Sequence, residues 1–249
     1  YFQYIAEHGG VTVDLASGPS GYFSPFLDTL EDNDIFIATD ACPAVIEAHS
    51  KACNKDNFYM FDVDLDKSLP FKNESIDIFK RYFENASRLG AKYINLHGDR
   101  PMGKLSVEEY CERFKILADE GKRFGITLCQ ENVNGYRSAD PEFLSDMVSF
   151  LGDDANFTLD IKQCVRAGYT VTQIMEAMNY KIKHVHISDH SLAGDCLLPT
   201  RGTFDFKGFM TDLEIKGYKG DYVIEVYQDA YKTYDEIIDS HSALCSSLK

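Results

Sequence analysis

The chain has 249 residues, which suits one large α/β barrel better than two small domains. Its formal net charge of −15 argues against binding to nucleic acid or to an anionic membrane, because both need a cationic protein face. Seven cysteines without Cys-x-x-Cys spacing indicate neither a disulfide framework nor a thiolate zinc site. With no apolar run near the roughly 18 residues of a membrane span and no signal-peptide pattern at the start, we expect a cytoplasmic protein.

Short apolar runs rich in β-formers alternate along the chain with helical patterns, which is typical of βα units with parallel strands. The eight predicted strands are Val11 to Leu15, Asp34 to Thr39, Asn57 to Val63, Lys92 to His97, Thr127 to Asn132, Asn156 to Asp160, Lys183 to Ser188 and Tyr222 to Val226. Apolar residues at steps of three and four predict a helix from about Ser75 to Leu89. Because no linker-like segment divides the chain, we expect one (β/α)8 barrel domain over residues 1–249.

A glycine-containing loop follows the first predicted strand. It runs from Val13 to Gly21, where glycines let backbone N–H groups approach a ligand at a helix N-terminus. Asp40 directly follows the second predicted strand, at a place where an acidic side chain can hydrogen-bond a ribose. These motifs resemble a class I methyltransferase that uses S-adenosylmethionine, and the resemblance covers residues 11 to about 79. It implies cofactor contacts from Asp14, Gly18, Asp40 and Asp62. The alternative, that the glycines simply make a tight βα turn, stays open.

From residue 81 onward, acids and histidines recur at the carboxyl ends of consecutive predicted strands. They are His97, Glu131, Asp160, His186 and Glu225. Because the βα loops of a parallel barrel open on one face, we expect these side chains to converge on one pocket. Carboxylates with an imidazole suit Mn²⁺, Mg²⁺, Co²⁺ or Zn²⁺, with a preference for Mn²⁺. His97 alone could instead be a satisfied rim histidine, and His184 is interpreted as a packed interior residue.

The same half of the chain resembles the xylose-isomerase-like barrel superfamily, which includes sugar and sugar-phosphate isomerases, epimerases and AP endonucleases. The matching motifs begin at Asn95, Cys129, Thr158, His184, Arg201 and Val223. The resemblance implies that the metal ligands are Glu131, Asp160, His186 and Glu225. It further implies that Glu131 and Glu225 shuttle a proton at a carbon next to a carbonyl, and that His97 and Arg201 contact substrate. Gln163 stands where epimerases and the AP endonucleases often have a histidine at or next to the metal, so the three-zinc nuclease site is incomplete and DNA repair is disfavoured.

Together the two resemblances predict an engineered or recombined chimera, with residues 1–79 from the methyltransferase fold and residues 80–249 from the isomerase barrel. The first three strands would lie side by side in chain order, and the eighth would close against the first. We expect a retained divalent-metal site with weak or no turnover of a small sugar or sugar phosphate. The alternatives are an inactive structural chimera and a module with residual affinity for S-adenosylmethionine. The sequence leaves the natural substrate, the metal and the oligomeric state open.

Overall fold

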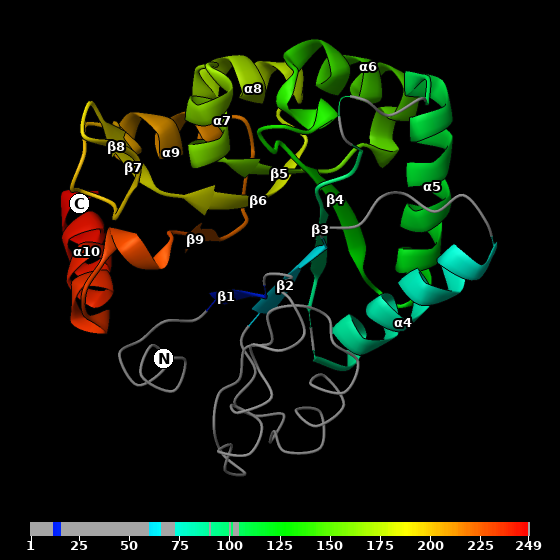
Figure 1. Cartoon of the computed structure of the whole chain (residues 1–249), viewed down its shortest axis with the longest axis horizontal. Coiled ribbons are helices and arrows are strands. Elements are labelled where there is room, and N and C mark those ends of the chain that lie inside the picture. The colour runs from blue at the N-terminus through cyan, green and yellow to red at the C-terminus, as the bar shows by residue number, and fades with distance from the viewer. Residues whose placement is uncertain are drawn as a thin grey trace. The chain divides into compact units, whose positions relative to one another are not determined.

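The computed structural model describes residues 12–15, 60–65, 73–89, 91–99, 101 and 105–248 (Figure 1). By contacts the chain divides into two compact units, Tyr1–Gln130 and Glu131–Lys249. The helices and strands, labelled as in Figure 1, are β1 (Thr12–Leu15), β2 (Met60–Leu65), α4 (Asn73–Leu89), β3 (Tyr93–Leu96), α5 (Val107–Arg123), β4 (Thr127–Glu131), η2 (Arg137–Ala139), α6 (Pro141–Leu151), η3 (Gly152–Asp154), β5 (Phe157–Asp160), α7 (Ile161–Ala167), α8 (Val171–Ala177), β6 (Ile182–Ile187), β7 (Asp189–Ser191), β8 (Gly194–Leu197), α9 (Phe206–Ile215), β9 (Tyr222–Ile224), η4 (Gln228–Ala230) and α10 (Tyr234–Ser247). Within these described ranges, none of the helices combines the length and the apolar character needed to cross a membrane.

The first unit contains a parallel sheet in the order β1-β2-β3-β4, except that Glu131, the last residue of β4, belongs to the second unit. The strand predicted over Asp34 to Thr39 lies outside the described residues. β2 corresponds to the third predicted strand, Asn57 to Val63. It pairs directly with β1, with Thr12 opposite Met60, so the first and third predicted strands are neighbours and the predicted chain order of the first three strands is wrong.

Helix α4 confirms the helix predicted from the apolar periodicity and begins two residues before the predicted start. Its Phe79, Phe83 and Ala86 are buried, as a stripe at steps of three and four requires. α5 packs against α4 and begins with a capping box, in which Ser106 and Glu109 satisfy each other's backbone N–H groups. The two helices thus form from local sequence signals and bury one apolar face each.

A buried polar network joins the ends of β3 and β4 to α5. The hydroxyl of Tyr110 donates to the side-chain oxygen of Gln130, whose Nε2 donates to the carbonyls of Leu96 at 2.8 Å and His97 at 3.1 Å. Gly98 lies beside this network with φ +83°, and a Cβ there would collide with the Tyr110 hydroxyl. Only glycine combines that backbone conformation with the close approach.

We expect Gly98→Ala to lower the free energy of unfolding by about 2 to 4 kcal/mol, because it adds a collision to an unfavourable positive φ. Gly125→Ala is the matched control: Gly125 also has a positive φ, +75°, but a Cβ there would meet nothing within 4 Å. The control should cost only about 1 to 2 kcal/mol. Urea denaturation of both variants measures the difference. Equal losses would show that the Tyr110–Gln130 network is not rigid.

The second unit contains the parallel strands β5, β6 and β9, in that order. They confirm the strands predicted over Asn156 to Asp160, Lys183 to Ser188 and Tyr222 to Val226. All four residues of β5 are buried, as in parallel strands covered on both faces. Helices α7 and α8 pack together beside β5 and β6 (Figure 1). The antiparallel hairpin of β7 and β8, which follows β6, was not predicted.

Candidate metal centre

Four of the predicted side chains converge within the second unit. Glu131 is the last residue of β4, Asp160 is the last residue of β5, His186 lies in β6, and Glu225 follows β9 directly. One potential ligand atom from each side chain lies within 4.8 Å of the other three. The side chains of Glu131, Asp160 and His186 are buried, and that of Glu225 is 29% exposed. The carboxyl ends of the strands therefore carry a compact cluster with one partly open side.

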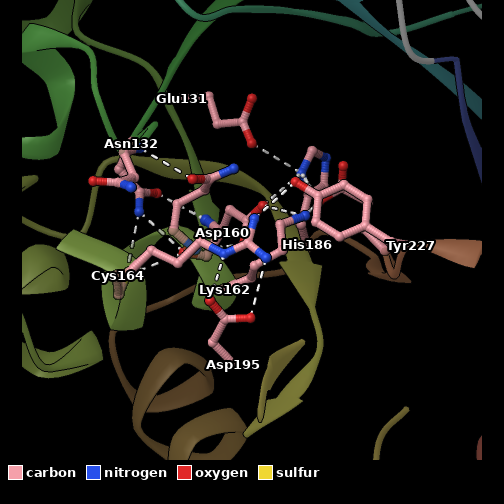
Figure 2. A network of polar contacts seen from close by, with 12 residues as sticks. Glu131, Asn132, Asp160, Lys162, Cys164, His186, Asp195 and Tyr227 are labelled. Carbon is pink, nitrogen blue, oxygen red and sulfur yellow. Dashed lines mark hydrogen bonds and ion pairs between the residues drawn. The ribbon is translucent and has the colours of Figure 1, made fainter. Parts of the chain in front are cut away.

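The imidazole of His186 faces the carboxylates of this cluster, and Figure 2 shows it beside Glu131. Its Nδ1 is 3.2 Å from Glu131 Oε1, 3.8 Å from Asp160 Oδ2 and 3.4 Å from Glu225 Oε2. The backbone N–H of Glu225 donates to the carbonyl of Ile187 at 3.0 Å, which continues the β6–β9 pairing past the last residue of β9. Strand pairing thus sets the position of Glu225 beside His186.

The two carboxylate oxygens of Asp160 have different tasks. Oδ1 accepts the backbone N–H of Gln163 at 3.1 Å and caps the N-terminus of α7. This bond turns Oδ2 toward His186 and the rest of the cluster. Asn132, which the sequence analysis did not single out, holds the backbone of Asp160 on both sides: its Oδ1 accepts the Asp160 N–H at 2.8 Å and its Nδ2 donates to the Asp160 carbonyl at 3.0 Å.

Lys162 is a further member of the cluster, which the sequence did not predict. Its side chain is 1% exposed, and its Nζ lies 2.5 Å from Glu225 Oε2 and 3.2 Å from Asp160 Oδ2. A lysine in the first turn of a helix is ordinarily expected to be exposed to solvent, and no local sequence pattern predicts that Lys162 is buried. The available signal is its position two residues after Asp160, on the turn that this carboxylate caps.

Burial and charge shift the pKa values of these groups in opposite directions. Burial raises the pKa of Asp160 to about 6, although Lys162 partly offsets the effect. Burial acts in the same direction on Glu225, but the Lys162 ammonium and His186 outweigh it and hold the pKa of Glu225 well below its ordinary value. Burial alone would lower the pKa of Lys162, whereas Asp160 and Glu225 raise it above its usual range. Lys162 is therefore an ammonium at neutral pH.

Aromatic and charged residues extend the cluster on the Lys162 side (Figure 2). The Lys162 Nζ lies 4.9 Å from the centroid of the Tyr227 ring, and the guanidinium of Arg166 lies 4.9 Å from the same centroid. Arg166 binds both carboxylate oxygens of Asp195, at 2.7 and 3.1 Å, and donates to the Tyr227 hydroxyl at 2.8 Å. These contacts fix the Tyr227 ring beside the ammonium.

Asp189, the first residue of β7, has a structural role. Its carboxylate accepts backbone N–H groups from His190 at 2.8 Å, Gly202 at 2.8 Å and Phe204 at 3.0 Å. A Cβ on Gly202 would collide with the Asp189 carboxylate and with the His190 carbonyl, so this close approach needs glycine. Asp189 thus ties the segment around Arg201 to β7.

For the other predicted site residues, the structure describes the local contacts. His97 belongs to the first unit, follows β3 and accepts from Gln130 through its carbonyl. Arg201 makes an ion pair with Glu236 at 2.6 Å, and Gln163 accepts the Asn134 N–H at 3.0 Å. His184 is buried with its ring centroid 5.1 Å from that of His186, but it does not contribute to the four-residue cluster.

Of the four predicted cofactor contacts, Asp14 and Asp62 are opposite each other in β1 and β2, while Gly18 and Asp40 lie outside the described residues.

The cluster fits a divalent cation in ligand type and spacing. An ion that bonds oxygen and nitrogen at about 2.1 Å keeps its ligand atoms about 3 to 4.2 Å apart. The distances from His186 Nδ1 to the three carboxylate oxygens, 3.2, 3.8 and 3.4 Å, lie in this range. Oδ2 of Asp160 is buried and accepts no hydrogen bond from the described residues, although it lies in ion-pair range of Lys162. Parallel strands that end on a mixed carboxylate and imidazole cluster define an α/β protein of the barrel type with a potential metal site.

The sequence profile of the xylose isomerase-like TIM barrel family matches residues 2–244. The chain belongs to this family. No curated protein matches the sequence. Because one family profile spans the chain almost completely, the segment 1–79 belongs to the same family match, and the comparisons give no support to a methyltransferase half or to a chimera. Glycine-containing βα turns and acids at strand ends occur in both fold types, which is why the first third resembled a nucleotide-binding fold.

Solved structures of the same architecture cover nearly all of the chain. A D-tagatose 3-epimerase-like protein is 18% identical, with a TM-score of 0.68 over 98% of this chain and 91% of that one. The 3-keto-D-glucoside 4-epimerase YcjR from E. coli is 17% identical, with a TM-score of 0.70 over 98% and 92%. A zinc-bound IolI protein is 17% identical, with a TM-score of 0.67 over 98% and 90%. At these identities the likeness establishes the fold alone.

Proposed function

We propose that this protein is a divalent-metal-dependent isomerase or epimerase of a small sugar or sugar phosphate. The observation that carries the proposal is the convergence of Glu131, Asp160, His186 and Glu225, whose ligand atoms lie within 4.8 Å of one another. Family membership and the sugar epimerases among the similar structures support the substrate class. Zinc in the IolI structure supports a metal in this type of fold.

In this proposal Glu131, Asp160, His186 and Glu225 hold the cation. A bound divalent ion supplies Lewis acidity that polarises the carbonyl and hydroxyl oxygens of a sugar. Asn132 fixes the Asp160 backbone, and the α7 cap turns Oδ2 toward the cluster, so the site is preorganised by hydrogen bonds that need no ligand.

Glu131 and Glu225 serve as the proton-transfer pair. One carboxylate removes the proton from the carbon next to the carbonyl, and the other returns a proton to complete the epimerisation or isomerisation. Glu131 is buried, which keeps water away from the carboxylate, while Glu225 is 29% exposed and lies on the side of the cluster that a substrate can reach. Glu131 is attached to the end of β4 and Glu225 follows β9, so the two carboxylates can approach the substrate carbon from different sides.

The proposal is tested by thermal unfolding of the whole chain with Mn²⁺, Mg²⁺, Co²⁺, Zn²⁺ or a chelator, followed by NMR of a panel of ketoses, aldoses and their phosphates. We expect one or more metals to raise the unfolding midpoint and to support interconversion of at least one sugar pair, because a bound ligand stabilises the folded state. An unfolding curve that ignores every metal, with no conversion in the panel, would refute the proposal.

The methyltransferase-type alternative has no observation in its favour. The side chains of Asp14 and Asp62 are not described, and Gly18 and Asp40 lie outside the described residues. Calorimetry with millimolar S-adenosylmethionine should show no binding heat. If both metal binding and sugar conversion are absent, the protein is best described as a folded barrel without activity.

A further inference from the structure

Lys162 occupies the side of the cluster that a metal would also use. Its Nζ is 2.5 Å from Glu225 Oε2 and 3.2 Å from Asp160 Oδ2. The Nδ1 of His186 faces these same two oxygen atoms at 3.4 and 3.8 Å. The ammonium and the imidazole therefore converge on two of the carboxylate oxygens that would coordinate a cation.

Charge balance explains why a lysine can be fully buried there. Three carboxylates whose oxygens lie within a few ångströms repel one another, and a cation among them relieves the repulsion. An unpaired buried ammonium would be costly, but this one has two carboxylate partners, which compensate its loss of hydration. The lysine thus supplies from within the chain part of the positive charge that a divalent ion would bring.

We propose that Lys162 is a built-in competitor of the divalent metal, so that metal binding must displace its ammonium from Asp160 and Glu225. This inference rests on the proposed metal site. A carboxylate oxygen that accepts a hydrogen bond at 2.5 Å has less electron density to give to a metal, and an ammonium next to a divalent ion is repelled. The lysine therefore lowers the affinity of the site and makes its occupancy depend on the metal concentration.

Tyr227 provides a place for the displaced ammonium. Its ring centroid is already 4.9 Å from the Lys162 Nζ, and Arg166 fixes the ring through a hydrogen bond of 2.8 Å to its hydroxyl. A small rotation of the lysine side chain would carry the ammonium away from the carboxylates while keeping a cation–π contact. Tyr227 is also 47% exposed, so the ammonium would move toward water.

The test is the affinity of the whole protein for Mn²⁺, measured by calorimetry at one fixed pH. We expect Lys162→Met to bind Mn²⁺ at least about tenfold more tightly than the unaltered protein, because it removes both the repulsion and the competing hydrogen bond. Lys181→Met is the matched control: Lys181 is also ion-paired, at 3.2 Å to the exposed Asp153, and it belongs to the same unit but not to the cluster. It should leave the affinity unchanged.

Lys162→Met also leaves the buried Asp160 and the partly buried Glu225 without their ammonium, so in chelator its unfolding midpoint should fall below that of the unaltered protein. Mn²⁺ should then raise its midpoint by more than it raises that of the unaltered protein. If the methionine variant does not fold, Lys162→Gln keeps a hydrogen-bond donor for Glu225 without the charge, and it should show the same tightening.

The outcomes separate this inference from the proposed function. If the unaltered protein binds Mn²⁺ and both lysine variants bind it equally or more weakly, the competitor role is wrong and the metal site stands. If neither the unaltered protein nor the variants bind Mn²⁺ at millimolar concentration, both the competitor role and the metal site are wrong.

Discussion

Replacing Glu131 by glutamine is expected to slow sugar interconversion by about 100- to 10,000-fold, the usual contribution of a positioned general base. Glutamine keeps a side-chain oxygen near His186, which lies 3.2 Å from the Glu131 carboxylate, but it cannot take up a proton. The loss should therefore fall on the chemical step. The measurement is conversion of the sugar identified by the panel, with deuterium uptake from D₂O followed by NMR.

Deuterium exchange with D₂O can distinguish the roles of the Glu131 and Glu225 carboxylates. If each acts on a different face of the carbon, Glu131→Gln should still exchange the proton of one epimer with solvent, and Glu225→Gln should exchange that of the other. Neither variant should interconvert the two. Glu176→Gln, on an exposed position of α8 in the same unit, is the control and should behave like the unaltered protein. Conversion at the unaltered rate by Glu131→Gln would show that Glu131 is not the base.

Asp160→Asn is expected to abolish stabilisation by metal. A site filled at about 100 times its dissociation constant adds roughly 2.7 kcal/mol to the free energy of unfolding, which raises the midpoint by about 5 to 10 °C for a chain of this size. Asparagine removes one negative charge from the cluster. It can still accept the Gln163 N–H that now binds Asp160 Oδ1 at 3.1 Å, so the α7 cap survives.

The measurement is the unfolding midpoint with saturating Mn²⁺ and with chelator. The metal-induced rise should vanish in Asp160→Asn and persist in Asp153→Asn, whose side chain is fully exposed in the same unit. In chelator, the Asp160 variant should unfold near the temperature of the unaltered protein, because Lys162 keeps Glu225 as a partner. A rise of equal size in both variants would mean that the metal binds elsewhere.

The sequence predicted the elements that frame the site because their signals are local. Parallel strands covered on both faces read as short apolar runs, so β5, β6 and β9 were found close to their observed bounds. α4 followed from its apolar periodicity. The hairpin of β7 and β8 was missed, since it is short and its strands are only partly buried.

The methyltransferase interpretation shows the limit of local motifs. A glycine-containing turn after a strand is compatible with several α/β folds, because the same steric need arises wherever a strand meets a helix. The family match over residues 2–244 uses the whole chain and leaves that interpretation without support. The observed strand order also differs from the predicted one, because β1 pairs directly with β2, which corresponds to the third predicted strand.

By itself the sequence determined that Glu131, Asp160, His186 and Glu225 would gather, because parallel strands bring their carboxyl ends to one edge and each residue lies at or next to the carboxyl end of such a strand. Only the tertiary structure decided what surrounds them. Lys162 meets Glu225 across 63 positions of the chain, a contact that depends on where α7 begins relative to β9. A buried ammonium is stable only where folding supplies its carboxylate partners, so its place in the site could not be read from its neighbours in sequence.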